Sequence, residues 1–167
     1  MKLTDDLHVI EKRVFQASGF KFNLVGIEAE SADYHACNFN VEGRTVKYRL
    51  AKITPTKNGQ FVTLWKRKPN GPIQPFDLSD EIDFVVITVK TKSELGLFIF
   101  PKEALIKHGI FSVKSKGGKR AIRVYPPWDK AGSKQAEKTQ KWQSEYFLDV
   151  PNNKSIDVKK CKSLFLV

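Results

Sequence analysis

Residues 49–67 read RLAKITPTKNGQFVTLWKR, and this stretch decides the expected fold. Residues 45–53, which lead into it, alternate apolar and basic side chains, the period-two pattern of a strand with one buried face. The turn TPTKNG follows, and its Asn58-Gly59 pair is a strong hairpin signal because these two residue types tolerate positive φ. Residues 60–66 then form a second strand. We therefore expect a β-sheet with a basic surface here.

The rest of the chain alternates between helical and extended patterns. Helices are predicted at residues 4–17, 101–109 and 133–148, and strands at residues 34–41, 84–90, 96–100, 110–113 and 121–125. The tail CKSLFLV, residues 161–167, is interpreted as a final strand rather than a dimer contact. A helix, a run of strands and two further helices separated by strands are typical of an α+β fold with a mixed β-sheet flanked by helices. The length of 167 residues suits a single domain over residues 1–167.

Positive charge is concentrated in two segments of the chain. Residues 43–76 hold eight basic residues and no acidic one, and residues 111–142 hold nine basic residues against two acidic ones. The formal net charge of the whole chain is +11, so the remaining residues are acidic on balance. Solubility does not require such segregation, because mixed signs on a surface serve it well. If the two segments fold side by side, they form a positive patch suited to a polyanion.

The second basic segment contains two elements that favour nucleic-acid binding. In KGGKR, backbone N–H groups of a glycine turn can line a phosphate while Lys119 and Arg120 supply charge. The predicted helix 133–148 places lysines at intervals of four and three residues, on one side. Expected contacts to nucleic acid are Lys52, Lys57, Lys66, Arg67, Lys119, Arg120, Arg123, Trp128, Lys134, Gln135, Lys138 and Trp142.

Several carboxylates are candidates for a metal site. Hydrolysis of a phosphodiester with Mg²⁺ needs two or three carboxylates around the ion, usually with a lysine beside the attacking water. Glu28, Glu30 and Asp83 are the candidate ligands, with Lys102 or Lys52 near the scissile phosphate. The residues two positions before these lysines are Phe100 and Leu50, so the acid-x-Lys pair of restriction-type nucleases is absent. No cofactor is expected unless the protein is catalytic, in which case Mg²⁺ is the candidate.

Cysteine content and hydropathy restrict the class of protein. The two cysteines, Cys37 and Cys161, form no CxxC pair, and only three histidines occur. This pattern argues against a disulfide framework and a structural zinc site, and we expect one buried and one surface thiol. Residues 1–20 show no signal-peptide pattern, and no stretch approaches the roughly 18–20 apolar residues of a membrane span. The expected location is the cytoplasm, without membrane insertion.

Six strings of residues resemble the MepB family of bacterial proteins, named for genes beside a multidrug efflux pump. They are EAESADYHACNF, YRLAKITPTKNGQFVTLWKR, PIQPFDLSDEIDF, GLFIFPKEAL, GGKRAIRVYPPWD and KQAEKTQKWQSEYF, within residues 22–147. The resemblance implies a fold similar to that of restriction-type endonucleases and an expected nucleic-acid-binding activity. The surface it implies comprises Lys52, Lys57, Lys66, Arg67, Lys119, Arg120 and Arg123.

Three hypotheses for function follow. The first is a nucleic-acid-binding protein without catalysis, with DNA as the expected partner. The second is a Mg²⁺-dependent nuclease that uses Glu30 and Asp83. The third is a small-molecule-binding accessory of an efflux operon, which would hold its ligand between Trp128, Trp142 and the lysines. DNA or RNA, strandedness and oligomeric state are left open, because contacts to phosphates carry no sequence information.

Overall fold

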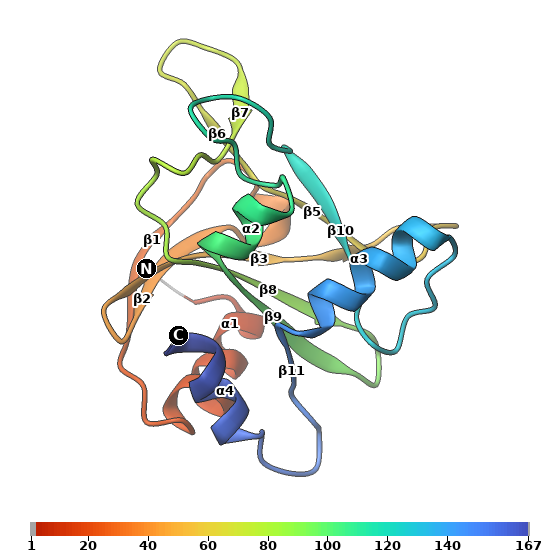
Figure 1. The fold of residues 1–167 in the computed structure, drawn as a ribbon. Helices are drawn as coiled ribbons and strands as arrows, with labels where there is room; N and C mark the ends of the chain where they lie inside the picture. The colour runs from red at the N-terminus through yellow and green to blue at the C-terminus, as the bar shows by residue number, and fades with distance from the viewer. Residues whose placement is uncertain (1–2, 167) are drawn as a thin grey trace.

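A six-stranded β-sheet forms the centre of the protein, whose computed structural model describes residues 3–166. The strand order is β1-β2-β3-β8-β9-β11, and β3 and β8 pair in parallel while the other neighbours are antiparallel. The strands are β1 (Phe22–Ile27), β2 (Cys37–Val41), β3 (Arg44–Leu50), β8 (Phe84–Lys90), β9 (Leu95–Pro101) and β11 (Phe147–Asp149). The mixed sheet has helices on its faces (Figure 1), which confirms the predicted α+β class.

Each face of this sheet packs a separate apolar cluster. Strand β8 alternates between them: Phe84 and Val86 join one cluster, and Val85 and Ile87 join the other. Since both faces are covered, β8 is an almost continuous apolar run, as expected for a central strand. The first face is covered by α1 (Asp5–Ile10), the π-helix η1 (Glu11–Gln16) and α4 (Val158–Phe165).

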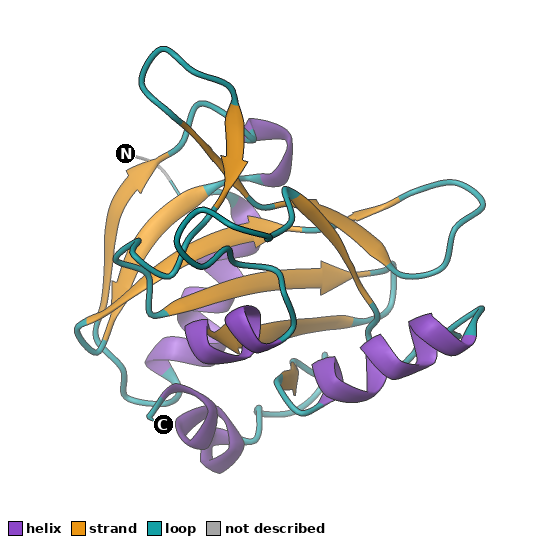
Figure 2. Ribbon diagram, turned by 45° about the horizontal axis from the view of Figure 1, so that its top comes forward, coloured by secondary structure: helices purple, strands orange, loops and turns teal. Residues whose placement is uncertain are grey.

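The opposite face carries a second sheet and α2 (Lys102–Lys107). The second sheet has the order β10-β5-β4 and is formed by β4 (Lys52–Ile53), β5 (Gln60–Thr63) and β10 (Ala121–Val124). A two-stranded ribbon of β6 (Trp65–Arg67) and β7 (Ile73–Pro75) extends from it, and α3 (Lys134–Ser144) lies beside β10 (Figures 1 and 2). A short 3-10 helix, η2 (Ala32–Tyr34), joins β1 to β2.

The predicted hairpin exists, but its two strands are shorter than expected. Strand 45–53 divides at Ala51, whose N–H donates to Thr88 of the large sheet before the chain enters β4 of the small one. Strand 60–66 divides at Leu64, which donates to the carbonyl of Arg120. Both divisions have the same cause, because the chain passes from one sheet to another there. The alternation of side chains continues through such a bend, so the pattern alone does not locate it.

Asn58-Gly59 lies in the turn of this hairpin, as predicted. Gly59 has φ of +74°, and a Cβ there would lie 2.7 Å from the ring of Tyr125. Glycine therefore serves two purposes at this position: it adopts the left-handed backbone conformation, and it lets Tyr125, the residue after β10, approach the turn.

Four other predicted elements were wrong in type or extent. The strand predicted at residues 34–41 begins only at Cys37, because η2 precedes it and His35 has positive φ. The helix predicted at residues 133–148 ends at Ser144, and its last residues form strand β11. Residues 110–113 make only isolated bridges instead of a strand. The tail predicted as a strand is the helix α4, although Val167 lies outside the described residues.

The tail did carry a helical signal. Cys161, Leu164 and Phe165 are buried and recur at spacings of three and four, as in an amphipathic helix. Asp157 caps the helix by accepting a hydrogen bond from the N–H of Lys160 at 3.0 Å.

Both cysteines are free and buried, so the expectation of one surface thiol was wrong. Burial raises the pKa of Cys37 to about 12 and also raises that of Cys161. Within residues 3–166, no helix is long and apolar enough to cross a membrane.

Candidate functional site

The two basic segments of the sequence meet in the small sheet. Strand β5 of the first segment pairs with β10 of the second, with Phe61 opposite Arg123 and Thr63 opposite Ala121. On its other side β5 pairs with β4, which places Lys52 opposite Phe61. The prediction that folding brings these segments side by side is therefore confirmed.

Helix α3 lies along the free edge of β10 and forms a groove with it. The groove has a volume of about 360 Å³. Its residues come from β5, β10, α3 and the segment that follows α2: Phe61, His108, Ile110, Lys119, Ala121, Ile122, Arg123, Tyr125, Ser133, Gln135, Ala136, Thr139, Trp142 and Gln143. We call this the α3–β10 groove. It contains Lys119, Arg123, Gln135 and Trp142, four of the predicted contact residues.

Two glutamines hold α3 in place. Gln143 is buried, and its side chain accepts from the N–H of Tyr125 at 2.8 Å and donates to the carbonyl of Arg123 at 3.0 Å. It therefore bonds to the edge of β10 as a neighbouring strand would. Gln140 donates to the carbonyls of Pro126 and Asp129. Gln140 and Gln143 are therefore used within the fold, whereas Gln135, the glutamine predicted to contact nucleic acid, lines the groove.

The first turn of α3 is organised by its N-cap. The hydroxyl oxygen of Ser133 accepts from the N–H of Ala136 at 3.1 Å. From this cap the helix presents Gln135, Thr139 and Trp142 to the groove, at spacings of four and three residues. Lys134 and Lys138 are exposed and do not line it. The lysines predicted to share one side of the helix therefore flank the groove.

Arg123 is held at the mouth of the groove. Its guanidinium donates to the hydroxyl of Thr54 at 2.8 Å and to the carbonyl of Asn58 at 3.4 Å. It also lies over the ring of Phe61, 5.6 Å from the centroid. These contacts hold the cation in one orientation, yet none of them neutralises its charge.

The predicted cations divide into two groups by their pairing. Lys66 pairs with Asp80 and Arg67 with Glu30, both at 2.7 Å. Lys52 lies 3.8 Å from Asp33. Within the described part of the chain, Lys57, Lys119, Arg120, Arg123, Lys134 and Lys138 make no ion pair. The predicted cations on the elements around the α3–β10 groove are therefore without an ion pair among the described residues, whereas Lys66 and Arg67 of the β6 ribbon are paired.

Aromatic side chains form the floor of the groove. The rings of His108 and Trp142 stack with centroids 3.9 Å apart and planes 6° apart. Burial and the nearby charge of Lys107 lower the pKa of His108, so its imidazole is neutral at pH 7. His108 follows α2 and reaches the groove only through tertiary packing. No pattern in the sequence pointed to it.

Trp128 does not share the groove with Trp142. It packs against the core with its ring edge-on to Phe147, at a centroid separation of 5.7 Å. The small-molecule hypothesis placed a ligand between the two tryptophans, and the structure does not bring them together in this way. Trp128 is therefore a core-packing residue and does not line the groove.

Glu28 forms a partly buried ion cluster. Its carboxylate accepts from Lys47 at 2.6 Å and lies 3.0 Å from a terminal nitrogen of Arg49, which is fully buried. Burial by itself would raise the pKa of Glu28, but the charges of Arg49 and Lys47 outweigh it, and the pKa is lowered. Arg49 also donates to the carbonyls of Thr63 and Tyr48. Because these contacts join β3 to β5, the cluster holds the two sheets together.

The carboxylates proposed as metal ligands have other partners. Glu28 and Glu30 are ion-paired as described, and Asp83 accepts from the N–H of Thr45 at 2.8 Å. Among residues 3–166, no three His, Cys, Asp or Glu side chains are grouped so as to hold a metal ion. Lys102, the candidate catalytic lysine, donates to the carbonyls of Leu78 and Asp80. Its ammonium group organises the loop before β8.

The same loop contains four acidic residues, Asp77, Asp80, Glu81 and Asp83. The carboxylate of Asp77 accepts from Ser79, Ser112 and the N–H of Ser115. These hydrogen bonds, led by that of Ser112, hold the pKa of Asp77 well below its usual range. Asp77 therefore joins the loop to the segment after α2, which carries His108.

If the α3–β10 groove binds nucleic acid, removal of metal ions is expected to leave that binding unchanged. The groove presents cations and neutral polar groups, and the carboxylates lie elsewhere in ion pairs. The dissociation constant for a labelled oligonucleotide, measured by fluorescence anisotropy, should be equal in EDTA and in Mg²⁺ at matched ionic strength. A requirement for Mg²⁺ would contradict this assignment and would direct attention to Glu30 and Asp83.

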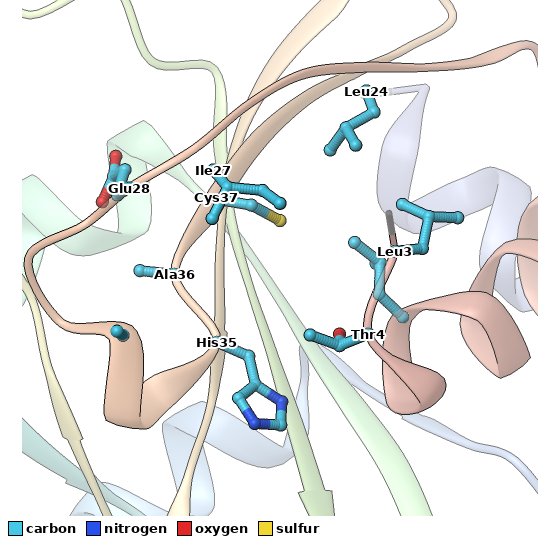
Figure 3. Close-up of a pocket in the computed structure, with 10 residues that line it drawn as sticks. Leu3, Thr4, Leu24, Ile27, Glu28, His35, Ala36 and Cys37 are labelled. Atoms are coloured by element: carbon cyan, nitrogen blue, oxygen red, sulfur yellow. The ribbon is translucent and has the colours of Figure 1, made fainter. Parts of the chain in front are cut away.

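A second, apolar pocket lies between α1 and the β1–β2 hairpin. Its volume is about 100 Å³, and Leu3, Leu24, Ile27 and Cys37 line it (Figure 3). Glu28 contributes to its wall, but its carboxylate lies in the ion cluster with Lys47. Within residues 3–166, no lysine or arginine lines this pocket, and its lining is mainly apolar.

Comparison with known proteins agrees with this architecture. The family model described as MepB-like matches residues 28–149, a span that includes the α3–β10 groove and the Glu28 cluster. A solved structure described as the crystal structure of MepB is similar, with a TM-score of 0.76 and 37% sequence identity. The alignment covers 91% of this chain and 99% of that chain. The search of curated proteins finds no match. The chain belongs to the MepB-like family.

Proposed function

We propose that this protein binds nucleic acid, with DNA as the first candidate, through the α3–β10 groove and the cations around it. The observation that carries the proposal is the pairing of β5 with β10, which joins two basic segments that are distant in the sequence. Lys119 and Arg123 line the groove, while Lys57, Arg120, Lys134 and Lys138 belong to the elements that surround it. We also propose an endonuclease-like fold, which is the expectation from the family. We further propose a cytoplasmic location, because the two free thiols remain reduced in that compartment.

The chemistry of these side chains suits the phosphate backbone. Binding of lysine and arginine to phosphates releases condensed counterions, and this release supplies most of the affinity that does not depend on sequence. A cation already paired with a carboxylate contributes less, because the pair must first be broken. The contacts to phosphate are therefore assigned to Lys119, Arg123 and Lys138 rather than to Lys66 and Arg67.

The affinity should fall steeply with salt. A plot of log Kobs against log salt concentration is expected to have a slope of about −0.9 per phosphate contact on duplex and about −0.7 on single strands. Replacing both Lys119 and Arg123 by alanine removes up to two contacts, so the slope should become less negative by roughly 1.4–1.8. Fluorescence anisotropy over a range of salt concentrations measures both quantities.

The double variant Lys12→Ala/Lys159→Ala is the matched control for this experiment. Both lysines are exposed, Lys12 on η1 and Lys159 on α4, and these two helices cover the opposite face of the large sheet. Their replacement also removes two positive charges without touching the groove, and it should leave the slope unchanged. Equal effects of the two substitutions would show that net charge alone drives binding. Absence of binding at low salt would overturn the proposal.

A further inference from the structure

The α3–β10 groove has features that contact with a phosphate backbone does not require. A flat basic surface is sufficient to bind duplex backbone, but this site is a concavity whose volume lies in the usual range for small-ligand clefts. Aromatic rings line it, contributed by Phe61, His108, Tyr125 and Trp142. In a duplex the faces of the bases are covered by their neighbours, so such rings are useful only to a base that is unstacked.

The stacked pair of His108 and Trp142 is a preformed platform. Their planes differ by 6°, and their close contact fixes the imidazole in position before any ligand arrives. The ring of Trp142 also packs against the core, with its centroid 5.3 Å from that of Phe100. His108 therefore presents the stacked pair to the groove. Neutral imidazole suits this task, because it is desolvated at lower cost than a cation.

The other walls of the groove supply polar groups that can pair with a base edge and cations that can contact a phosphate. Gln135 and Thr139 face the groove from α3 and carry donors and acceptors able to pair with a base edge. Gln143 is not available for this, because its amide is used by β10. On the opposite wall Arg123 is held over Phe61 with its charge unneutralised, and Lys119 lies on the same side. The cations thus lie within reach of the phosphate attached to a bound base.

We infer that the α3–β10 groove receives an unpaired base of single-stranded nucleic acid, stacked on the His108–Trp142 pair, with its phosphate on Lys119 and Arg123. This inference rests on the proposed function and adds strandedness to it. Stacking sites of this kind are tolerant of sequence, because every base has an aromatic face.

An oligonucleotide with abasic positions tests the inference directly. We compare a short oligothymidine with a strand of equal length and phosphate number that lacks bases, using fluorescence anisotropy on the full chain. Alanine substitutions at stacking positions cost roughly 5–150-fold in affinity, so the abasic strand should bind at least about fivefold more weakly. A duplex of the same length should also bind more weakly per site. If the abasic strand binds as tightly as oligothymidine, the inference fails while the proposed function stands. If neither strand binds at low salt, both fail.

Variants of His108 identify the position of the base. His108→Ala should reduce the affinity for oligothymidine at least about fivefold and leave that for the abasic strand unchanged. His108→Phe should restore most of the loss, since it replaces one flat ring by another. His8→Ala, an exposed histidine on α1 at the opposite face of the large sheet, is the matched control and should have no effect. If His108→Ala weakens the two strands equally, His108 does not stack on a base, and the inference is overturned.

A free nucleotide could supply the same ring and phosphate as a strand does. Thymidine monophosphate therefore serves as a competitor in the same assay. Because neighbouring phosphates of a strand contact the surrounding lysines, the oligonucleotide should bind far more tightly than the mononucleotide. Displacement by an equal concentration of the mononucleotide would overturn the assignment to a strand.

Discussion

Replacing Glu28 by alanine is expected to lower the free energy of unfolding by about 3 kcal/mol. The guanidinium of Arg49 is fully buried, and Glu28 is the carboxylate that balances its charge at 3.0 Å. Without Glu28, this charge stays in a low-dielectric environment between β3 and β5 with backbone carbonyls as its partners. Loss of one partner from a buried pair costs much more than the pair contributes, because the other charge remains desolvated. Urea unfolding at pH 7 measures the effect.

Glu30→Ala is the matched control, two residues away. Glu30 pairs with Arg67 at 2.7 Å, but both side chains are about half exposed. Exposed pairs of this kind contribute roughly 0–1 kcal/mol, because water solvates each charge after the other is removed. We expect Glu30→Ala to change the stability by less than this limit. Equal losses in the two variants would refute the structural role assigned to the Glu28 cluster.

The pH dependence of stability follows from the same cluster. The pKa of Glu28 is lowered in the folded state, so the folded protein binds a proton here less readily than the unfolded chain does. The stability that Glu28 contributes is therefore fully present above its ordinary pKa and is lost as the pH falls through its folded-state pKa. The stability difference between the wild type and Glu28→Gln should accordingly be largest at neutral pH and shrink as the pH falls below about 4. A difference that stays constant down to pH 2 would contradict this.

Replacing Gln143 by leucine is expected to affect both stability and binding. Leucine has a similar volume, but it removes the bonds to the N–H of Tyr125 and the carbonyl of Arg123. An unsatisfied buried polar group costs roughly 1–3 kcal/mol, so a loss of about 2–6 kcal/mol is expected for the two groups together. Thermal and urea unfolding measure this loss.

The binding effect follows because Gln143 anchors one wall of the groove. When α3 is free to move from β10, the distance between Gln135 on one wall and Arg123 on the other is no longer defined. Affinity for oligothymidine should therefore fall even under conditions in which the variant is fully folded. Gln135→Ala is a control for stability alone, since Gln135 is exposed and its side chain makes no hydrogen bond within residues 3–166: it should leave stability within about 0.5 kcal/mol. A stable Gln143→Leu variant that binds normally would show that α3 is positioned by other contacts.

Local pattern predicted several elements correctly because their cause is local. The apolar run of β8 and the Asn58-Gly59 hairpin depend on burial period and on backbone conformation, which adjacent residues determine. The ends of elements were less predictable. Ala51 donates to Thr88 and Leu64 donates to Arg120, and these partners lie far along the chain. The tail was predicted as a strand because residues 164–167 form a short apolar run, although the buried residues of α4 have helical spacing.

In the candidate site too, some features could be predicted from the sequence and others depend on tertiary packing. The predicted cations at Lys119 and Arg123 were recognisable from composition, since an excess of positive charge is a property of the sequence. His108 was not recognisable as a groove residue, because it reaches Trp142 only through the packing of α2 near α3. Glu28 and Glu30 looked alike in the sequence. Burial separates them, since one balances an inaccessible guanidinium and the other an exposed one.

Taken alone, the sequence determined the α+β class, the hairpin and the presence of two strongly basic segments, because residue type and short-range period are sufficient for each. The tertiary structure decided which cations remain without an acidic partner, which carboxylates are used as structural counter-ions, and which aromatic rings share a groove. The physical reason is that the net charge of a segment is the sum of the charges of its residues, whatever the fold. Pairing, burial and stacking depend on which distant residues come within a few ångströms, and only the pairing of β5 with β10 and the docking of α3 bring these together.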